Sequence, residues 1–261
     1  MSRHPLFWVA AVALPFFACQ PATPPAPATP PLTVAITTLR KENCLRDSVC
    51  ATLDLSYPVL TGGTATTAAI NDSIEAFVYL VTEANPNLPL PLAIDSAALK
   101  MLAQLREDDA IRNRDYSMSY VNELKSKVLW QTSRYLSLEM NTYSFSGGAH
   151  GMYGTLLETF DLTTGQPLAL TAVIRDTAAL RPLLEKAFVA DKQTEAPDVS
   201  LRDLVFPEFQ QLPMPAIYCI VPEGVRFVYN PYEVASYAVG QTDILLSWQQ
   251  LGTLADKAKW Q

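Results

Sequence analysis

The sequence has little histidine and little cysteine, which narrows the metal and catalytic chemistry that it can support. Only two histidines occur among 261 residues, and only His150 lies beyond the N-terminal apolar segment. A zinc site with two histidines therefore cannot form within one chain, and the H-E-x-x-H and C-x-x-C patterns are absent. We expect no metal site and no cofactor.

Motifs for covalent or acid–base catalysis are missing as well. A Ser-His-Asp triad would have to use His150, and no G-x-S-x-G motif is present to expose a serine. The adjacent carboxylates of Asp108 and Asp109 would point about 100° apart on a helix, which disfavours acid–base work by this pair. We expect no catalytic residues; a hydrolase that uses His150 as its base is the alternative.

Positive charge is also scarce. Lysine and arginine total 19 against 26 aspartates and glutamates, which gives a formal net charge of −7. An acidic surface repels the phosphate backbone of nucleic acids, so we expect no nucleic-acid partner. The same surface attracts basic partners.

The N-terminal apolar run is too short for a membrane-spanning helix. It extends from Pro5 to Ala18 behind Arg3, against the ~20 residues that a bilayer requires, and is typical of a signal peptide. Ala18 directly before Cys19 resembles a bacterial lipoprotein cleavage site. We therefore expect a signal peptide at 1–18, lipidation of Cys19 and export to the bacterial envelope, facing the periplasm or the cell surface. An ordinary secretory signal is the alternative.

Residues 19–32 form the predicted linker between the lipid and a globular domain. Proline, alanine and threonine dominate this stretch and it carries no charge. Such a composition favours an extended, semi-rigid spacer over a packed helix or sheet. The lipid anchor would place the domain beside a membrane without crossing it.

The remaining chain has the pattern of a mixed fold. Strands and helices come in groups, which predicts an α+β fold with a mostly antiparallel sheet packed against about three helices. The second helix is expected to begin at Asp95 or Ser96 and to bury Leu99, Leu102 and Leu105. The clearest elements are strands at 34–37, 49–57, 216–221, 225–230 and 244–246 and helices at 70–81 and 180–188.

The stretch from Arg134 to Gly165 contains two predicted strands and a glycine-rich crossing. Leu136 and its alternate neighbours are apolar while the residues between them are polar, which predicts one buried and one solvent-exposed face. Residues 147–151 supply glycines and His150, and Gly165 closes a hairpin turn. We interpret His150 as a structural histidine, hydrogen-bonded in the crossing, and leave a functional role as the alternative.

The cysteines of the mature chain divide into a pair and a single residue. Cys44 and Cys50 lie six residues apart in a chain predicted to be exported, where such a pair more often forms a disulfide than a metal site. Cys219 lies on the apolar face of a predicted strand. We expect it to be a buried free thiol.

Several short motifs, taken in order, resemble a known family. The run GGAHG, followed by FDLTTGQPLAL and NPYEVASYAVG, resembles the RsiV-like extracellular domain family, which includes the ectodomain of a lysozyme-sensing anti-sigma factor. Upstream, SYPVLTGG and AAINDSIEAF are similar to the companion N-terminal half found with PdaC-like peptidoglycan deacetylases. The resemblance implies one domain over 33–251, with halves 33–130 and 131–251. A loosely held tail is expected at 252–261.

The resemblance also implies a function. The catalytic domain of those deacetylases is a separate module, so the expected role is a non-catalytic envelope lipoprotein that binds a lysozyme-like protein or peptidoglycan. The candidate partner-binding residues are His150, Tyr153, Tyr232 and Tyr237, because exposed aromatic rings stack on sugars or fill a cleft. Each tyrosine could instead be a half-buried sheet residue. A purely structural lipoprotein is a further alternative.

Overall fold

The computed structural model describes residues 32–62, 65–111, 118–194 and 196–260. The predicted signal peptide, Cys19 and the linker up to residue 31 lie outside these ranges. Within the described residues, no helix combines the length and the apolar character needed to cross a membrane.

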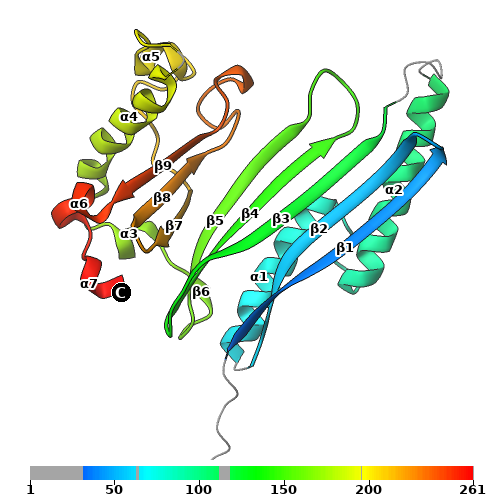
Figure 1. The fold of residues 1–261 in the computed structure, drawn as a ribbon, viewed down its shortest axis with the longest axis horizontal. Helices are drawn as coiled ribbons and strands as arrows, with labels where there is room; N and C mark the ends of the chain where they lie inside the picture. Colours follow the sequence, from blue (N-terminus) through cyan, green and yellow to red (C-terminus); the bar gives the residue numbers. More distant parts are fainter. Residues whose placement is uncertain (1–31, 63–64, 112–117, 195, 261) are drawn as a thin grey trace, which may run out of the picture.

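A six-stranded sheet occupies the centre of the molecule, with its strands in chain order from β1 to β6 (Figure 1). Neighbours are antiparallel except β2 and β3, and this parallel pair is connected through two helices, because parallel strands need a long crossover. The elements are β1 (Thr33–Arg46), β2 (Val49–Thr61), α1 (Ala65–Thr82), α2 (Leu90–Ile111), β3 (Tyr120–Gln131), β4 (Tyr135–Phe145), β5 (Met152–Asp161) and β6 (Gln166–Pro167).

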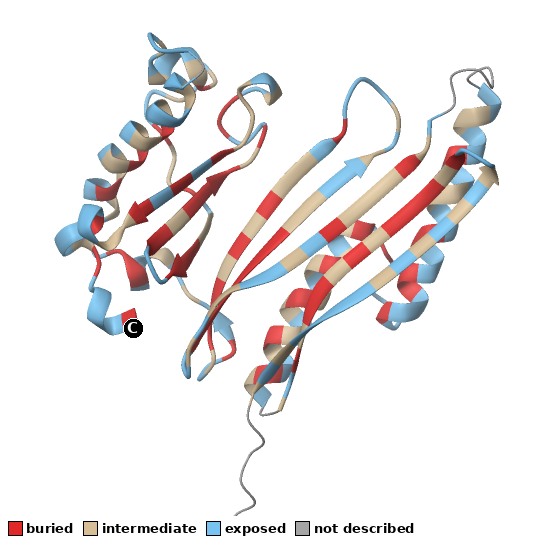
Figure 2. Cartoon of the chain, viewed as in Figure 1, coloured by how far each residue is buried: buried red, intermediate tan, exposed pale blue. Residues whose placement is uncertain are grey.

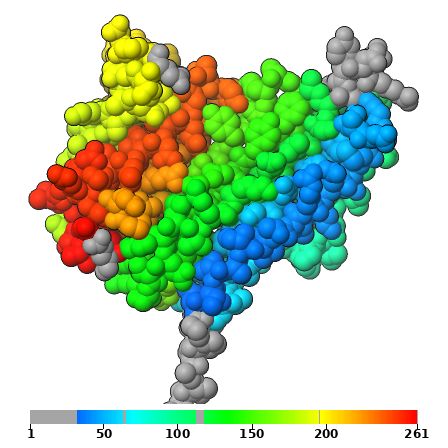
Figure 3. Space-filling view, in the orientation of Figure 1, coloured from blue at the N-terminus to red at the C-terminus, as the bar shows by residue number. Residues whose placement is uncertain are grey.

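The C-terminal part forms a second, three-stranded antiparallel sheet in the order β7-β8-β9. Chain order largely follows position, so that colours run from blue at one end of the molecule to red at the other (Figure 3). The predicted α+β fold with mostly antiparallel strands is confirmed. The remaining elements are α3 (Leu170–Val173), α4 (Thr177–Gln193), α5 (Leu201–Leu204), β7 (Ile217–Val221), β8 (Gly224–Tyr229), η2 (Tyr237–Val239), β9 (Thr242–Ser247), α6 (Trp248–Leu251), η3 (Gly252–Leu254) and α7 (Lys257–Trp260).

One face of the six-stranded sheet packs against α1 and α2. Ile70, Ile74 and Val78 recur at helical spacing on α1, and all three are at most 1% exposed. They share a core with Leu136 and Leu138 of β4. The sheet therefore buries its apolar side against these helices.

The opposite face of β4 is buried too, so the prediction of one solvent-exposed face is wrong. Ser137 is 0% exposed and Glu139 is 2% exposed, although both are polar. Figure 2 shows the first half of β4 as a continuous buried stretch. The cause is the second sheet, whose side chains cover this face: the backbone N–H of Ile220 donates to the Thr159 hydroxyl at 2.8 Å, and that hydroxyl lies 2.8 Å from the hydroxyl of Ser137. Strand β4 thus lies between two cores.

The second helix differs from its prediction. Helix α2 begins at Leu90, not at Asp95 or Ser96. Pro91 falls in its first turn, where a missing N–H breaks no helical hydrogen bond, so the proline-rich segment starts the helix. The buried face consists of Leu90, Ala93, Ile94, Ala97, Ala98 and Leu105. Leu99 lies on the other side of the helix and is 61% exposed.

The chain end is held more firmly than predicted. Trp260 is 2% exposed, and its ring centroid lies 5.1 Å from that of Tyr135 at the start of β4. The expectation of a loosely held segment beyond Gly252 is therefore wrong, because burying a tryptophan side chain outweighs the cost of ordering a few residues.

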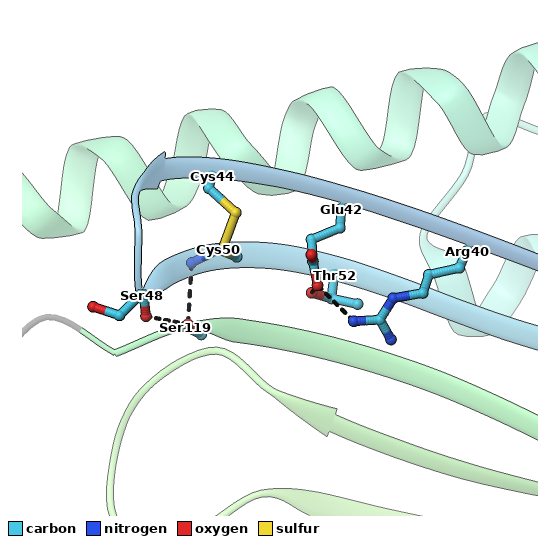
Figure 4. Close-up of a disulfide and its surroundings, with 7 residues drawn as sticks. All are labelled: Arg40, Glu42, Cys44, Ser48, Cys50, Thr52 and Ser119. Carbon is cyan, nitrogen blue, oxygen red and sulfur yellow. Dashed lines mark hydrogen bonds and ion pairs between the residues drawn. A yellow bond between two sulfur atoms is a disulfide. The ribbon is translucent and has the colours of Figure 1, made fainter.

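The predicted Cys44–Cys50 disulfide is present, with a Cα–Cα distance of 3.9 Å across the β1–β2 hairpin. Next to it, Ser119 accepts a hydrogen bond from the Cys50 N–H at 3.0 Å and donates to the Ser48 carbonyl at 3.1 Å (Figure 4). The bridge and this serine tie the hairpin to the segment that leads into β3. Cys219 is a buried free thiol, as predicted.

Candidate functional site

The four predicted partner-binding residues come together at one end of the six-stranded sheet. His150 lies in the segment between β4 and β5, and Tyr153 lies at the start of β5. Tyr232 and Tyr237 lie in the loop between β8 and β9, residues 230–241. We call these four residues the aromatic cluster. Their gathering could not be deduced from spacing alone, because about 80 residues separate the two pairs.

Tyr237 is the centre of the aromatic cluster. The His150 ring stacks on it, with centroids 3.8 Å apart and planes 19° apart. Tyr153 meets it edge to face at 5.7 Å, and Tyr232 is tilted against it at 5.8 Å. The two contacts between tyrosines lie within the range of centroid distances at which aromatic rings attract one another.

The glycine-rich crossing explains how the rings approach so closely. The Tyr237 hydroxyl donates to the Gly151 carbonyl at 2.9 Å, and Nδ1 of His150 lies 3.0 Å from the same oxygen. A Cβ atom at Gly151 would lie 2.5 Å from the ring of Tyr143. Glycine at this position therefore lets a further tyrosine, 38% exposed, border the cluster.

Tyr232 has an unusual backbone conformation. It has φ = 68° and follows Pro231 in a turn closed by the Glu233 N–H, which donates to the Asn230 carbonyl at 3.2 Å. That position of a turn normally takes glycine or asparagine, and a bulky residue there is strained. The side chain is 50% exposed, so burial does not compensate for the strain.

Asn230 anchors the loop to the sheet. Its Oδ1 accepts from the Thr155 N–H at 2.8 Å and its Nδ2 donates to the Thr155 carbonyl at 3.0 Å. Nε2 of Gln241, at the other end of the loop, donates to the same Oδ1 at 2.9 Å. Sequence reasoning missed this role, and the only local signal was the Asn-Pro dipeptide, which indicates a turn.

Tyr229 does not belong to the exposed group, although it is close in sequence to Tyr232. It is 2% exposed, packs edge to face against Phe188, and its hydroxyl donates to the Pro213 carbonyl at 2.7 Å. Burial raises the pKa of its hydroxyl above the ordinary value. Tyr229 is therefore a buried strand residue and not part of the aromatic cluster.

Glu139 lies at the centre of a group of charged side chains on the face of β4 that the second sheet covers. Glu139 accepts hydrogen bonds from Lys127 at 2.8 Å, from Asn141 at 2.7 Å and from Arg226 of β8, which also binds Asp243. Burial opposes ionisation of Glu139, but these three donors outweigh it and lower the pKa of the carboxyl. The group joins the two sheets, and Arg226 is too distant from Glu139 in sequence for this contact to be predicted.

The aromatic cluster is suited to stacking more than to proton transfer. No acidic residue lies next to His150 in the sequence. Within the described chain, its imidazole contacts the Gly151 carbonyl oxygen and the ring of Tyr237. Loss of solvent, together with the nearby phenols of Tyr153, Tyr143 and Tyr232, raises the pKa of Tyr237. Tyr237 therefore stays neutral and donates a hydrogen bond at physiological pH. No group of three metal-binding side chains occurs within the described residues.

Two family models match successive parts of the chain. The model described as deacetylase PdaC matches residues 45–153, and the model described as a protein of unknown function, DUF3298, matches residues 173–249. The first ends at Tyr153 and the second includes Tyr232 and Tyr237, so the aromatic cluster lies where the two matched segments meet. No curated protein matches the chain.

Solved structures share the fold. A DUF3298 family member from Bacteroides fragilis has a TM-score of 0.67 at 21% identity, over 87% of this chain and 95% of its own. A DUF3298 family protein from Pseudomonas aeruginosa has a TM-score of 0.59 at 16% identity, over 87% of this chain and 96% of its own. The two matched segments, together with the shared fold, support a bacterial domain of the PdaC/DUF3298 type.

Proposed function

We propose that this protein is a non-catalytic lipoprotein of the bacterial envelope that binds cell-wall glycan through the aromatic cluster. The observation that carries the proposal is Tyr232, an exposed tyrosine held in a strained conformation against Tyr237. Strain of this kind persists where function requires it. Exposed, pre-arranged rings bind the apolar faces of sugars without losing much side-chain freedom.

The test uses sedimentation with purified, insoluble peptidoglycan and the full chain in detergent. Tyr232→Gly relieves the strain at φ = 68° and removes the ring. We expect at least tenfold weaker binding together with a gain in stability of about 1 kcal/mol, the usual cost of this conformation for a residue other than glycine. A tyrosine kept for structure would give the opposite pattern, with lost stability and unchanged binding.

Met152→Ala is the matched control. Met152 is 40% exposed and adjoins Tyr153, but alternation along β5 places it on the other face. Binding should be unchanged in this variant. Equal losses of peptidoglycan binding in Met152→Ala and Tyr232→Gly would show that binding does not depend on the ring of Tyr232 in particular, and the proposal would fail.

A lysozyme-like protein is the second candidate partner. The net charge of −7 favours a basic partner, and the finer resemblance to the RsiV-like family supports the same choice. Titration with a lysozyme at 0.05 M and 0.5 M salt separates the candidates, because screening slows charge-steered association while ring stacking on a neutral sugar changes little. Absence of binding at low salt would remove this candidate.

The location is part of the proposal. Cys19→Ser should move the protein from the membrane fraction to the soluble fraction, because a lipid chain on this cysteine would be the only anchor predicted from the sequence. Ser2→Ala leaves Cys19 intact and serves as the control for changes near the N-terminus. A Cys19→Ser variant that stays in the membrane fraction would contradict the lipoprotein assignment.

A further inference from the structure

The three-stranded sheet has an open edge at β9. In the order β7-β8-β9, β9 has β8 as its single partner strand among the described residues. Its six residues, Thr242–Ser247, span about 20 Å at ~3.3 Å per residue. The backbone groups on the outer side of β9 therefore offer a template for another strand.

A groove of about 570 Å³ runs along this edge. Its walls include Ile244, whose side chain faces the α4 core, and Leu245, whose side chain faces the other way. Because side chains from both faces of β9 line this groove, the groove lies along the edge of the strand and not over one of its faces. Helix α4 supplies the second wall through Leu183, Lys186, Ala187, Ala190 and Asp191. Figure 1 shows α4 beside β9.

The β9 edge lacks the protection found on other edges of the molecule. Strand β1 carries Arg40, Lys41 and Glu42 in its middle, which is a common way to prevent unwanted pairing. The outer strand β7 is held against β5 through the bond from Ile220 to Thr159. Strand β9 has no lysine, proline or arginine, and its Leu245 is 47% exposed.

We propose that this groove binds an extended peptide segment of another protein, which adds to β9 as a fourth strand, with apolar residues at alternate positions and an acidic residue facing Lys186. Backbone pairing would supply affinity, and the pockets beside the strand would supply selectivity. This site is separate from the aromatic cluster, so its test is independent of the proposed glycan binding.

Charge selects this occupant over two others. Asp191 pairs with Lys192, and Asp243 pairs with Arg226, whereas Lys186 is exposed and makes no ion pair within the described residues. A second copy of β9 would bring only Asp243, which is already neutralised. The chain's own linker at 20–31 has six prolines without N–H groups and no carboxylate, so it cannot form the ladder or meet Lys186.

The experiment is selection of displayed random heptapeptides on the purified full chain in detergent, followed by titration of the best peptide as a labelled synthetic compound. Methyl groups are then placed on its backbone amides one at a time. We expect losses of tenfold or more at every second amide and little change at those between, because only alternate N–H groups of a strand face β9.

Two variants locate the site. Leu245→Lys should weaken the peptide at least tenfold, while Leu80→Lys, at a 72% exposed leucine of α1, should not. Lys186→Glu should disfavour the acidic peptide and accept a version with lysine in place of its acid. Three outcomes overturn the proposal: no peptide is enriched, methylation shows no alternation, or Leu245→Lys binds normally. Dimers formed through β9, detected by light scattering, would assign the edge to a second copy and likewise overturn it.

Discussion

At the scale of single residues, glycines decide where the chain can turn and how closely its segments approach. Gly165 has φ = 72° and closes the turn after β5, with its N–H donating to the Asp161 carbonyl at 2.8 Å. A Cβ atom at this position would lie 2.7 Å from the backbone carbonyl oxygen of Thr66 in α1. One residue therefore meets two constraints, one conformational and one steric.

Gly165→Ala should lower the free energy of unfolding by about 2–4 kcal/mol, since the left-handed conformation and a backbone clash both add cost. Gly148→Ala is the control, because Gly148 also has positive φ, 105°, but has no atom within 4 Å of a built Cβ. Urea unfolding of both variants measures the difference. Similar losses would show that conformation alone sets the cost.

The sequence predicted which aromatic residues form the cluster better than it predicted the hydrogen bonds and the backbone conformation that hold them. The motif GGAHG and the tyrosines of 229–237 predicted two candidate partner-binding segments, and the structure brings the four candidate residues together around Tyr237. The bidentate bond of Asn230 and the strain at Tyr232 could not be predicted, because both depend on a loop docking onto β5 from a distant part of the chain.

At the scale of elements, β4 shows that alternating apolar and polar residues predict a strand but do not decide whether its polar face is exposed to solvent. Period two correctly predicted a strand, and Leu136 faces the helices as expected. Polar residues on the other face suggested solvent, yet Glu139 is covered by β8 and paired with Arg226. A polar residue can be buried where partners satisfy it, and the pattern of one strand does not reveal its partners.

The Glu139 group should make the union of the two sheets depend on pH. Its pKa is lowered in the folded state, so its contribution is present above the ordinary carboxyl pKa of about 4.3 and is lost as pH falls through the lower folded value. Glu139→Gln should destabilise the protein at pH 7 by about 2–4 kcal/mol, because Arg226 keeps only Asp243.

Unfolding by urea at pH 7 and at pH 3 checks this expectation: the gap between wild type and Glu139→Gln should narrow at the lower pH. Asp243→Asn provides the comparison, since Asp243 binds the same arginine but its side chain is 40% exposed. Its loss at pH 7 should be below 1 kcal/mol, as for exposed pairs. Equal losses in the two variants would contradict the burial argument.

At the scale of the whole molecule, the C-terminal helix α7 packs against the start of β4, a strand from the middle of the sequence. Trp260 packs on Tyr135, so that the last helix closes the core formed by α4 and the three-stranded sheet. This contact could not be predicted from the sequence, because a helix of four residues is too short to show a helical periodicity. The contact depends on the completed fold.

Trp260→Ala should lower the free energy of unfolding by about 3–5 kcal/mol, the usual cost of removing a buried tryptophan. Trp260→Phe keeps much of the packing and removes an indole N–H that has no hydrogen-bond partner among the residues that the structure describes, so its loss of stability should be less than half as large. Thermal unfolding of both variants provides the measurement. A negligible effect of alanine would show that the contact is not maintained in solution.

The burial of β4 on both faces determines where the chain could be cut into fragments that keep their fold. The PdaC match ends at Tyr153, inside the hairpin whose strands contribute to both cores. A fragment that stopped there would lack most of β5 and would expose Ser137 and Glu139 without their partners. We therefore expect a fragment that ends at Tyr153 to be less stable than the whole chain, because the polar face of β4 loses the side chains that cover it.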